Sequence, residues 1–199
     1  MKLSIIVPHL SHSKSIDLFT NIIKQNTHTK NYEIVSIVDN TDVYKAFNDG
    51  VKYSSGDVVV LINDDMFVQK NWDIEYIKYA TGKTIVTGQV VEPGLVTGVS
   101  CKNIKMNFGD TPDLYQREKF EQWANEEVLK TEVCSNSKGW YMPFAVQKKY
   151  FIEYPNEIKF PHPNDVTLFD DILPKMGYTF IKVNSFCYHL QGFSHIKRK

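Results

Sequence analysis

The stretch Val58-Val-Val-Leu-Ile-Asn-Asp-Asp65 decides the fold of this chain. It begins with an apolar, mostly β-branched run, and a short run of this kind is typical of a strand buried on both faces of a sheet. The run stops at Asn63, Asp64 and Asp65. Neighbouring carboxylates repel each other unless a cation or hydrogen bonds neutralise them, and open α/β sheets bind ligands at the carboxyl ends of their strands. The stretch therefore predicts a divalent cation that holds a phosphate-bearing substrate at this edge of a sheet.

The residues before this strand alternate between strand and helix patterns. We expect strands over residues 3–7 and 33–38, helices over 14–25 and 43–53, and the third strand at 58–62. Because the loops are short, this β-α-β-α-β order implies parallel strands with right-handed crossovers. Asp39 follows the second strand as Asp65 follows the third, so we expect both carboxylates at one edge of the sheet. Thr41 or Asp42 is expected to cap the second helix.

The rest of the chain alternates less regularly, and a chain of 199 residues is typical of one domain. We expect further strands over 83–91, 95–100, 178–183 and 185–189, a strand or extended loop over 139–146, and helices over 112–129, 148–151 and 165–176. We see no interdomain linker and no internal repeat. A boundary between two halves of the domain, 1–95 and 96–199, is expected near residues 90–100.

Composition excludes several classes of protein. Lys and Arg together number 23, as do Asp and Glu, so the formal net charge is +0 and no global field attracts nucleic acid or an anionic membrane. The 42% hydrophobic content supports a real core. No apolar run approaches the roughly 18 residues of a membrane span, and the amino terminus lacks a signal-peptide pattern. Three widely spaced cysteines favour a reducing compartment, and we expect the cytoplasm of a cell or of an infected host.

Four segments, taken in order, resemble one known family. They are Leu3-Ser-Ile-Ile-Val-Pro8, Val38-Asp-Asn-Thr-Asp42, the run from Asn48 through Asp57 to Asp65, and the set Asn164-Asp165, Met176-Gly-Tyr178 and Cys187-Tyr-His189. This pattern resembles the family 2 glycosyltransferases of GT-A fold. The resemblance implies an α/β fold with a Rossmann-like, mostly parallel central sheet flanked by helices. It also implies that residues 1–95 bind a nucleotide-sugar and residues 96–199 bind the acceptor.

The resemblance also implies roles for individual residues. It places Pro8, His9, Asp39, Asn63 and Asp64 in the donor pocket, Asp65 and His189 on a Mn²⁺ or Mg²⁺ ion, and Asp165 as the general base. Asp39 would accept a hydrogen bond from a base imide N–H or a ribose hydroxyl, and Asp64 or Asn63 would contact sugar or ribose hydroxyls. Asp165 would take the proton from the acceptor hydroxyl as it attacks the anomeric carbon.

The implied function is metal-dependent transfer of a hexosyl or pentosyl group from a nucleotide-diphosphate sugar to an acceptor hydroxyl. The family implies inversion at the anomeric carbon, and Asp39 favours a UDP-sugar donor. The acceptor is open among a glycan, a protein, a small molecule and modified nucleic acid.

Other interpretations remain open at the level of sequence. Asp39 and Asp165 are also suited to capping helices, Asp64 and Asp65 to a solvated turn, and His189 to a core or surface position. A nucleotidyltransferase uses a similar sheet and acidic metal site. A non-catalytic nucleotide- or sugar-binding module is a third possibility, because Asn63 and Asn164 stand where the family usually has acids.

Overall fold

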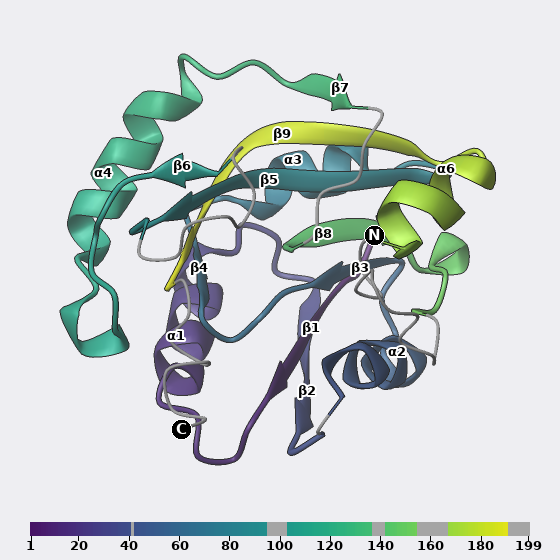
Figure 1. The fold of residues 1–199 in the computed structure, drawn as a ribbon, viewed down its shortest axis with the longest axis horizontal. Helices are drawn as coiled ribbons and strands as arrows, with labels where there is room; N and C mark the ends of the chain where they lie inside the picture. The colour runs from purple at the N-terminus through teal and green to yellow at the C-terminus, as the bar shows by residue number, and fades with distance from the viewer. Residues whose placement is uncertain (41, 95–102, 137–141, 155–166, 191–199) are drawn as a thin grey trace.

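One mixed sheet forms the centre of the molecule, and helices pack on both of its faces (Figure 1). The computed structural model describes residues 1–40, 42–94, 103–136, 142–154 and 167–190. Within these residues the sheet has nine strands, with the order β2-β1-β3-β8-β5-β9-β4 and with β6 and β7 beside this path. The predicted α/β class with a largely parallel central sheet is confirmed.

The amino-terminal half forms the predicted β-α-β-α-β unit. Strand β1 (Leu3–His9) lies between β2 (Tyr32–Val38) and β3 (Val58–Leu61) and pairs parallel with both. Helix α1 (Ile16–Asn26) and helix α2 (Val43–Tyr53) provide the two crossovers. These elements lie where the hydrophobic periodicity predicted them.

The carboxyl-terminal half adds strands of both directions to this unit. Strand β8 (Phe144–Gln147) pairs antiparallel with β3 and with β5 (Thr84–Glu92), and β5 pairs parallel with β9 (Thr179–His189). Two antiparallel steps restore the original direction, so β5 and β9 run the same way as the first three strands. The carboxyl ends of β1, β2, β3, β5 and β9 therefore lie at one edge of the sheet.

Short elements complete the described part of the fold. Strand β4 (Met66–Val68) pairs antiparallel with β9, β6 (Ile104–Lys105) pairs with β5, and β7 (Cys134–Asn136) pairs with β9. The remaining helical segments are α3 (Asp73–Tyr79), η1 (Pro112–Leu114), α4 (Arg117–Val128), η2 (Lys148–Tyr150), the π-helical η3 (Thr167–Ile172) and α6 (Leu173–Lys175).

The structure of this half differs from the expected elements in two ways. The two strands expected over 178–183 and 185–189 are one strand, β9, which continues past an irregularity in its pairing with β5 between Thr87 and Gln89. Strand β4 and helix α3 were not predicted, because β4 has only three residues and α3 is a short helix. The strand expected over 95–100 lies outside the described residues.

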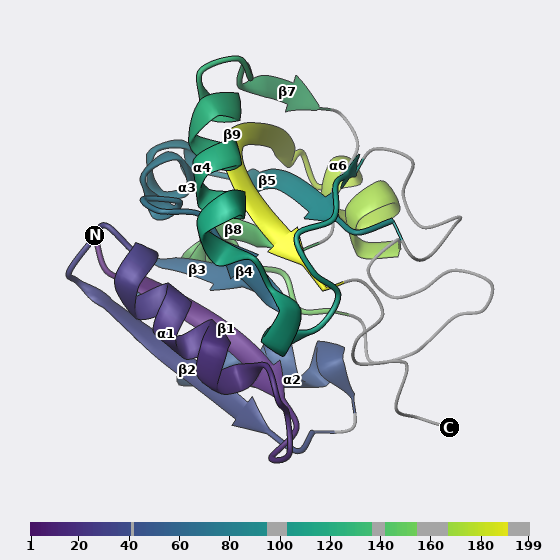
Figure 2. The ribbon, with the colours of Figure 1, turned by 90° about the vertical axis from the view of Figure 1, so that its left-hand side faces the viewer.

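The core is divided by the sheet into two layers. Alternate strand residues point to opposite faces, so Leu3, Ile5 and Val7 pack in the layer that holds the buried side of α1. Ile6 packs in the other layer, with Phe47 of α2. Figure 2 shows α1 and α4 on one face of the sheet and α2 on the other. None of the helices among the described residues combines the length and apolar character that a bilayer span requires.

Candidate functional site

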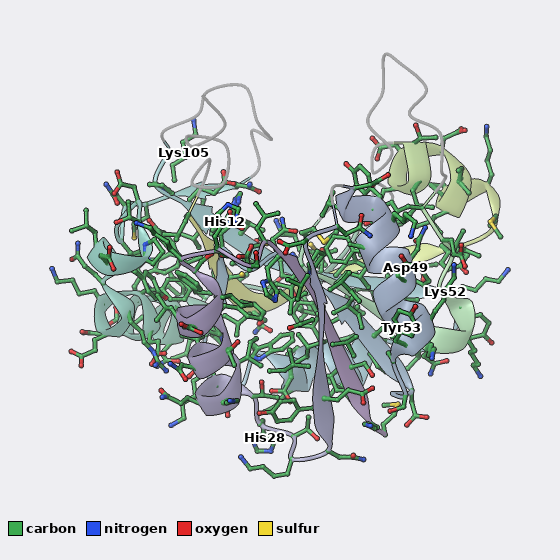
Figure 3. All side chains as sticks on the ribbon, turned by 90° about the horizontal axis from the view of Figure 1, so that it is seen from below. His12, His28, Asp49, Lys52, Tyr53 and Lys105 are labelled. Carbon is green, nitrogen blue, oxygen red and sulfur yellow. The ribbon has the colours of Figure 1, made fainter. Side chains whose placement is uncertain are left out.

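Acidic and histidine side chains gather at the edge where the parallel strands end. The strands β2, β3, β5 and β9 end next to or at Asp39, the Asn63–Asp65 turn, Glu92 and His189, respectively. Figure 3 shows His12 and Lys105 toward this edge of the molecule and His28 toward the opposite end. The predicted gathering of carboxylates at one edge is present in the structure.

Asp65 lies at this edge, directly before β4, and is only 4% exposed. Its backbone carbonyl accepts a hydrogen bond from the Leu190 N–H at 3.0 Å. Its Oδ1 atom is buried and has no hydrogen-bond partner among the described residues. Buried carboxylate oxygens are normally paired, so this oxygen is suited to a ligand.

His189 reaches Asp65 through the pairing of β4 with β9. Met66, the residue after Asp65, lies opposite His189 in the antiparallel register. As a result, His189 Nε2 lies 3.7 Å from Asp65 Oδ2. This register explains how two residues more than 120 positions apart in the sequence come to face each other.

Glu92 contacts the other nitrogen of the same histidine. Its Oε1 lies 2.8 Å from His189 Nδ1, and the Glu92 residue is 4% exposed. Burial opposes the charged imidazolium, but the Asp65 and Glu92 carboxylates outweigh it and raise the pKa of His189 to about 10. Burial likewise opposes the Glu92 carboxylate, yet hydrogen bonds from His189 and Asn103 lower the pKa of Glu92 below its usual value.

The Asp65–His189 pair fits a divalent cation. A gap of 3.7 Å is too long for a direct hydrogen bond, and it matches the roughly 3 to 4 Å between two ligands of one ion with bonds of about 2.1 Å. Carboxylate oxygen and imidazole nitrogen are both ordinary ligands of Mn²⁺. The described residues provide no group of three His, Cys, Asp or Glu side chains around one such point. An ion held by this pair would need further ligands from outside these side chains.

Asp64 is turned away from this pair and holds the loop between β1 and α1. Its Oδ2 accepts hydrogen bonds from Ser13 Oγ and, at 3.0 Å, from Ser15 Oγ. Burial raises the pKa of Asp64 against the opposing effect of these hydrogen bonds. One oxygen of the Asp64 carboxylate is therefore used in hydrogen bonds that stabilise this loop.

Asp39 holds the other end of the same loop. Its Oδ1 accepts a hydrogen bond from the Ser11 N–H at 2.7 Å, and this contact lowers the pKa of Asp39. The residue is exposed and has a positive φ of 55°. It does not cap α2, because Asp42 is the cap and accepts hydrogen bonds from the N–H groups of Tyr44 and Lys45. The predicted cap at Asp42 is confirmed, and the alternative of a cap at Asp39 was wrong.

The structure also places the other predicted residues. Pro8 and His9 end β1 opposite Ile37 and Val38 of β2, and the His9 carbonyl accepts the Asp39 N–H at 3.0 Å. Asn63 is half-buried in the turn from β3 to β4. Asp165 lies outside the described residues.

Sequence reasoning missed Glu92, Ser13 and Ser15. An available signal pointed to Glu92, because an acid directly after a predicted strand of a parallel sheet belongs at the ligand-binding edge. Nothing local in the sequence distinguished the two serines from an ordinary helix start, since their contact with Asp64 depends on how β1 and β3 pair.

Comparison with known proteins identifies the family. The model of glycosyl transferase family 2 matches residues 9–137, which is more than half of the chain. A crystal structure of GalNAc-T7 with UDP, GalNAc and Mn²⁺ superposes with a TM-score of 0.64 and 11% sequence identity, and the match covers 94% of this chain and 43% of that one. A comparison with curated proteins finds no match. The similarity to GalNAc-T7 shows the fold, and the family match shows that this chain belongs to glycosyltransferase family 2.

Proposed function

We propose that this protein transfers a sugar from a nucleotide-diphosphate donor to an acceptor hydroxyl with the help of a divalent cation. The observation that carries the proposal is the Asp65–His189 pair: a buried carboxylate with an unpaired Oδ1 faces an imidazole Nε2 across 3.7 Å. The pair lies at the carboxyl ends of parallel strands, where α/β sheets bind their ligands.

The chemistry of the leaving group explains why such a pair is useful. The donor leaves as a nucleoside diphosphate, which gains negative charge as the glycosidic bond breaks. A bound Mn²⁺ or Mg²⁺ ion would stabilise that charge more in the transition state than in the ground state. Asp65 and His189 would hold this ion, and burial of Asp65 keeps competing water away.

The proposed donor pocket is bordered by the β1–α1 loop, which two carboxylates hold in place. Asp39 and Asp64 hold opposite ends of the β1–α1 loop through Ser11 and Ser13. Asp39 remains exposed, so its second oxygen can accept a hydrogen bond from a base imide or a ribose hydroxyl. GalNAc-T7 was crystallised with UDP and Mn²⁺, which supports a UDP-sugar as the donor here. Pro8, His9 and Asn63 complete the proposed pocket.

The proposal for the acceptor side of the reaction rests on the family resemblance. We propose Asp165 as the general base and an inverting transfer, on the family resemblance alone. Asp165→Asn is expected to leave donor affinity nearly unchanged and to slow transfer by roughly a hundredfold. Asn caps a helix as well as Asp does, so a variant with full activity and an unchanged melting temperature would contradict the assignment.

Calorimetry and a donor screen test the whole proposal. The protein is titrated with UDP in the presence of Mn²⁺ and in the presence of a chelator, and hydrolysis is then measured across a panel of hexosyl and pentosyl nucleotide-sugars. Metal-dependent UDP binding with hydrolysis of one donor supports the proposal. Binding without hydrolysis or transfer would indicate a non-catalytic module, and release of pyrophosphate from a nucleoside triphosphate would indicate a nucleotidyltransferase.

Two wider expectations remain part of the proposal. The acceptor is a glycan, a protein, a small molecule or modified nucleic acid, and transfer assays on each class would distinguish them. The cytoplasm is the expected compartment, and the thiols of Cys134 and Cys187 are free in the structure, as a reducing compartment would keep them.

A further inference from the structure

Glu92 is a buried carboxylate that contacts a residue of the proposed metal pair. It ends strand β5, and its Oε1 lies 2.8 Å from His189 Nδ1. The side chain of Glu92 is only 5% exposed. A buried carboxylate is costly unless its hydrogen bonds compensate for the lost water. The hydrogen bond between Glu92 and His189 is therefore expected to be kept at a defined geometry.

The contact determines which nitrogen of His189 is available. An ionised carboxylate only accepts hydrogen bonds. His189 Nδ1 therefore carries a proton and donates the hydrogen bond to Glu92. In the neutral ring the other nitrogen, Nε2, then carries the lone pair. This Nε2 is the atom that lies 3.7 Å from Asp65 Oδ2.

The contact also fixes the orientation of the ring. His189 is the last residue of β9, and its backbone is held opposite Met66 of β4. Backbone pairing does not prevent the imidazole from turning about its side-chain bonds. The hydrogen bond to Glu92 does prevent it, because Glu92 is held in β5 and β5 pairs with β9 along most of its length.

We propose that Glu92 is a positioning residue that keeps His189 Nε2 directed at Asp65 and thereby sets the affinity of the Asp65–His189 pair for a divalent cation. The inference rests on the proposed function, since it requires that this pair hold a metal. Carboxylate partners of metal-bound histidines commonly change metal affinity by 10- to 100-fold when they are lost.

Two substitutions separate positioning from charge. Glu92→Gln removes the charge but keeps an oxygen at the same distance, so Nδ1 still has its acceptor. Glu92→Asp keeps the charge but shortens the side chain by one methylene, so the carboxylate no longer reaches Nδ1. If Glu92 acts by positioning, Mn²⁺ affinity measured by calorimetry falls at least tenfold in Glu92→Asp and less than about threefold in Glu92→Gln.

A spectroscopic measurement gives a second readout that does not depend on activity. Pulsed electron paramagnetic resonance of bound Mn²⁺ detects the coupling of a directly bound imidazole nitrogen. We expect this coupling in the parent protein and in Glu92→Gln, and its loss in Glu92→Asp. Parental affinity and coupling in Glu92→Asp would overturn the inference, and together with a loss in Glu92→Gln they would indicate a charge effect. Equal losses in both variants would also overturn it, because Glu92→Gln keeps an acceptor for Nδ1.

Matched controls keep failure of the inference distinct from failure of the proposed function. Glu33 is a hydrogen-bonded carboxylate at the opposite end of the sheet, so Glu33→Gln and Glu33→Asp are expected to leave Mn²⁺ affinity unchanged. A parent protein that binds no Mn²⁺, with or without UDP, contradicts the proposed function itself. A protein in which His189→Ala weakens Mn²⁺ binding and neither Glu92 variant does contradicts only the role of Glu92.

Discussion

The carboxylates at the two ends of the sheet differ in how completely hydrogen bonds satisfy them. At the amino ends of the strands, Glu33 accepts hydrogen bonds from Lys2, Ser4 and Ser55. Asp73, which is fully buried, accepts the N–H groups of two consecutive residues, His28 and Thr29.

At the carboxyl ends of the strands the pattern is incomplete. Asp65 is nearly as buried as Asp73, yet its Oδ1 has no hydrogen-bond partner among the described residues. Asp39 gives one oxygen to Ser11 and is otherwise exposed. A satisfied carboxylate stabilises the fold, whereas an unsatisfied one lowers stability unless a ligand completes it. The same residue type therefore supports the fold at one end of the sheet and, as we propose, binds substrate at the other.

The strongest test of this comparison is the loss of Asp73. Asp73→Ala removes a buried carboxylate that accepts two charge-assisted hydrogen bonds, from the N–H groups of His28 and Thr29, so we expect the free energy of unfolding to fall by about 3 kcal/mol. Chemical denaturation measures this change. The affinity for UDP and Mn²⁺ should not change in the folded fraction. Glu126→Ala removes an exposed acid from α4 and serves as the control, with an expected change within about 0.5 kcal/mol.

The second test uses the acid dependence of stability. Burial raises the pKa of Glu33, but hydrogen bonds from Lys2, Ser4 and Ser55 outweigh this effect and lower the pKa to about 2 from an ordinary 4.5. A lowered pKa gives stability that is present above about pH 4.5 and is lost as the pH falls toward 2.

We expect Glu33 to account for about 2 kcal/mol of this acid-induced loss. Glu33→Gln should therefore be less stable than the parent at pH 7, and the difference should shrink as the pH approaches 2. Denaturation at a series of pH values provides the measurement. A constant difference across this range would show that the ionised form of Glu33 is not what stabilises this end of the sheet.

The third test addresses the unsatisfied carboxylate. Asp65→Asn keeps the shape of the side chain and removes its charge, so Mn²⁺-dependent UDP binding should weaken by about tenfold, ~1.4 kcal/mol. Calorimetry with Mn²⁺ and with a chelator measures the effect. Equal UDP binding in the parent and the variant, with metal and with chelator, would show that Asp65 is not a metal ligand.

The fold of the amino-terminal half of the chain was predictable from sequence, and much of the carboxyl-terminal half was not. The periodicity of β1, α1, β2, α2 and β3 specified their order and direction, so Asp39 and Asp65 could be assigned to one edge. Glu92 and His189 meet Asp65 only through the register of β4, β5 and β9. Short strands carry too few residues for a periodic signal, and register between distant strands is set by packing that no local pattern contains.

The last test asks whether Asp39 only stabilises the β1–α1 loop or also binds the base of the nucleotide. It uses a substitution that the backbone conformation at this position tolerates. The positive φ of 55° would strain Ala, whereas Asn accepts this conformation and can keep an oxygen toward the Ser11 N–H. Asp42→Asn, which preserves the α2 cap, is the matched control.

Asp39→Asn places an NH₂ donor at the position of the second carboxylate oxygen, an acceptor that does not bind the Ser11 N–H. If this acceptor binds the imide N–H of uracil, UDP affinity should fall by about fivefold, ~1 kcal/mol, because two donors then face each other. Cytosine presents an acceptor at the corresponding ring nitrogen, so CDP affinity should fall less or rise. Competition calorimetry with UDP and CDP measures the ranking. An unchanged ratio of UDP to CDP affinity would assign Asp39 to the satisfied carboxylates, as a residue that holds the β1–α1 loop and does not read the base.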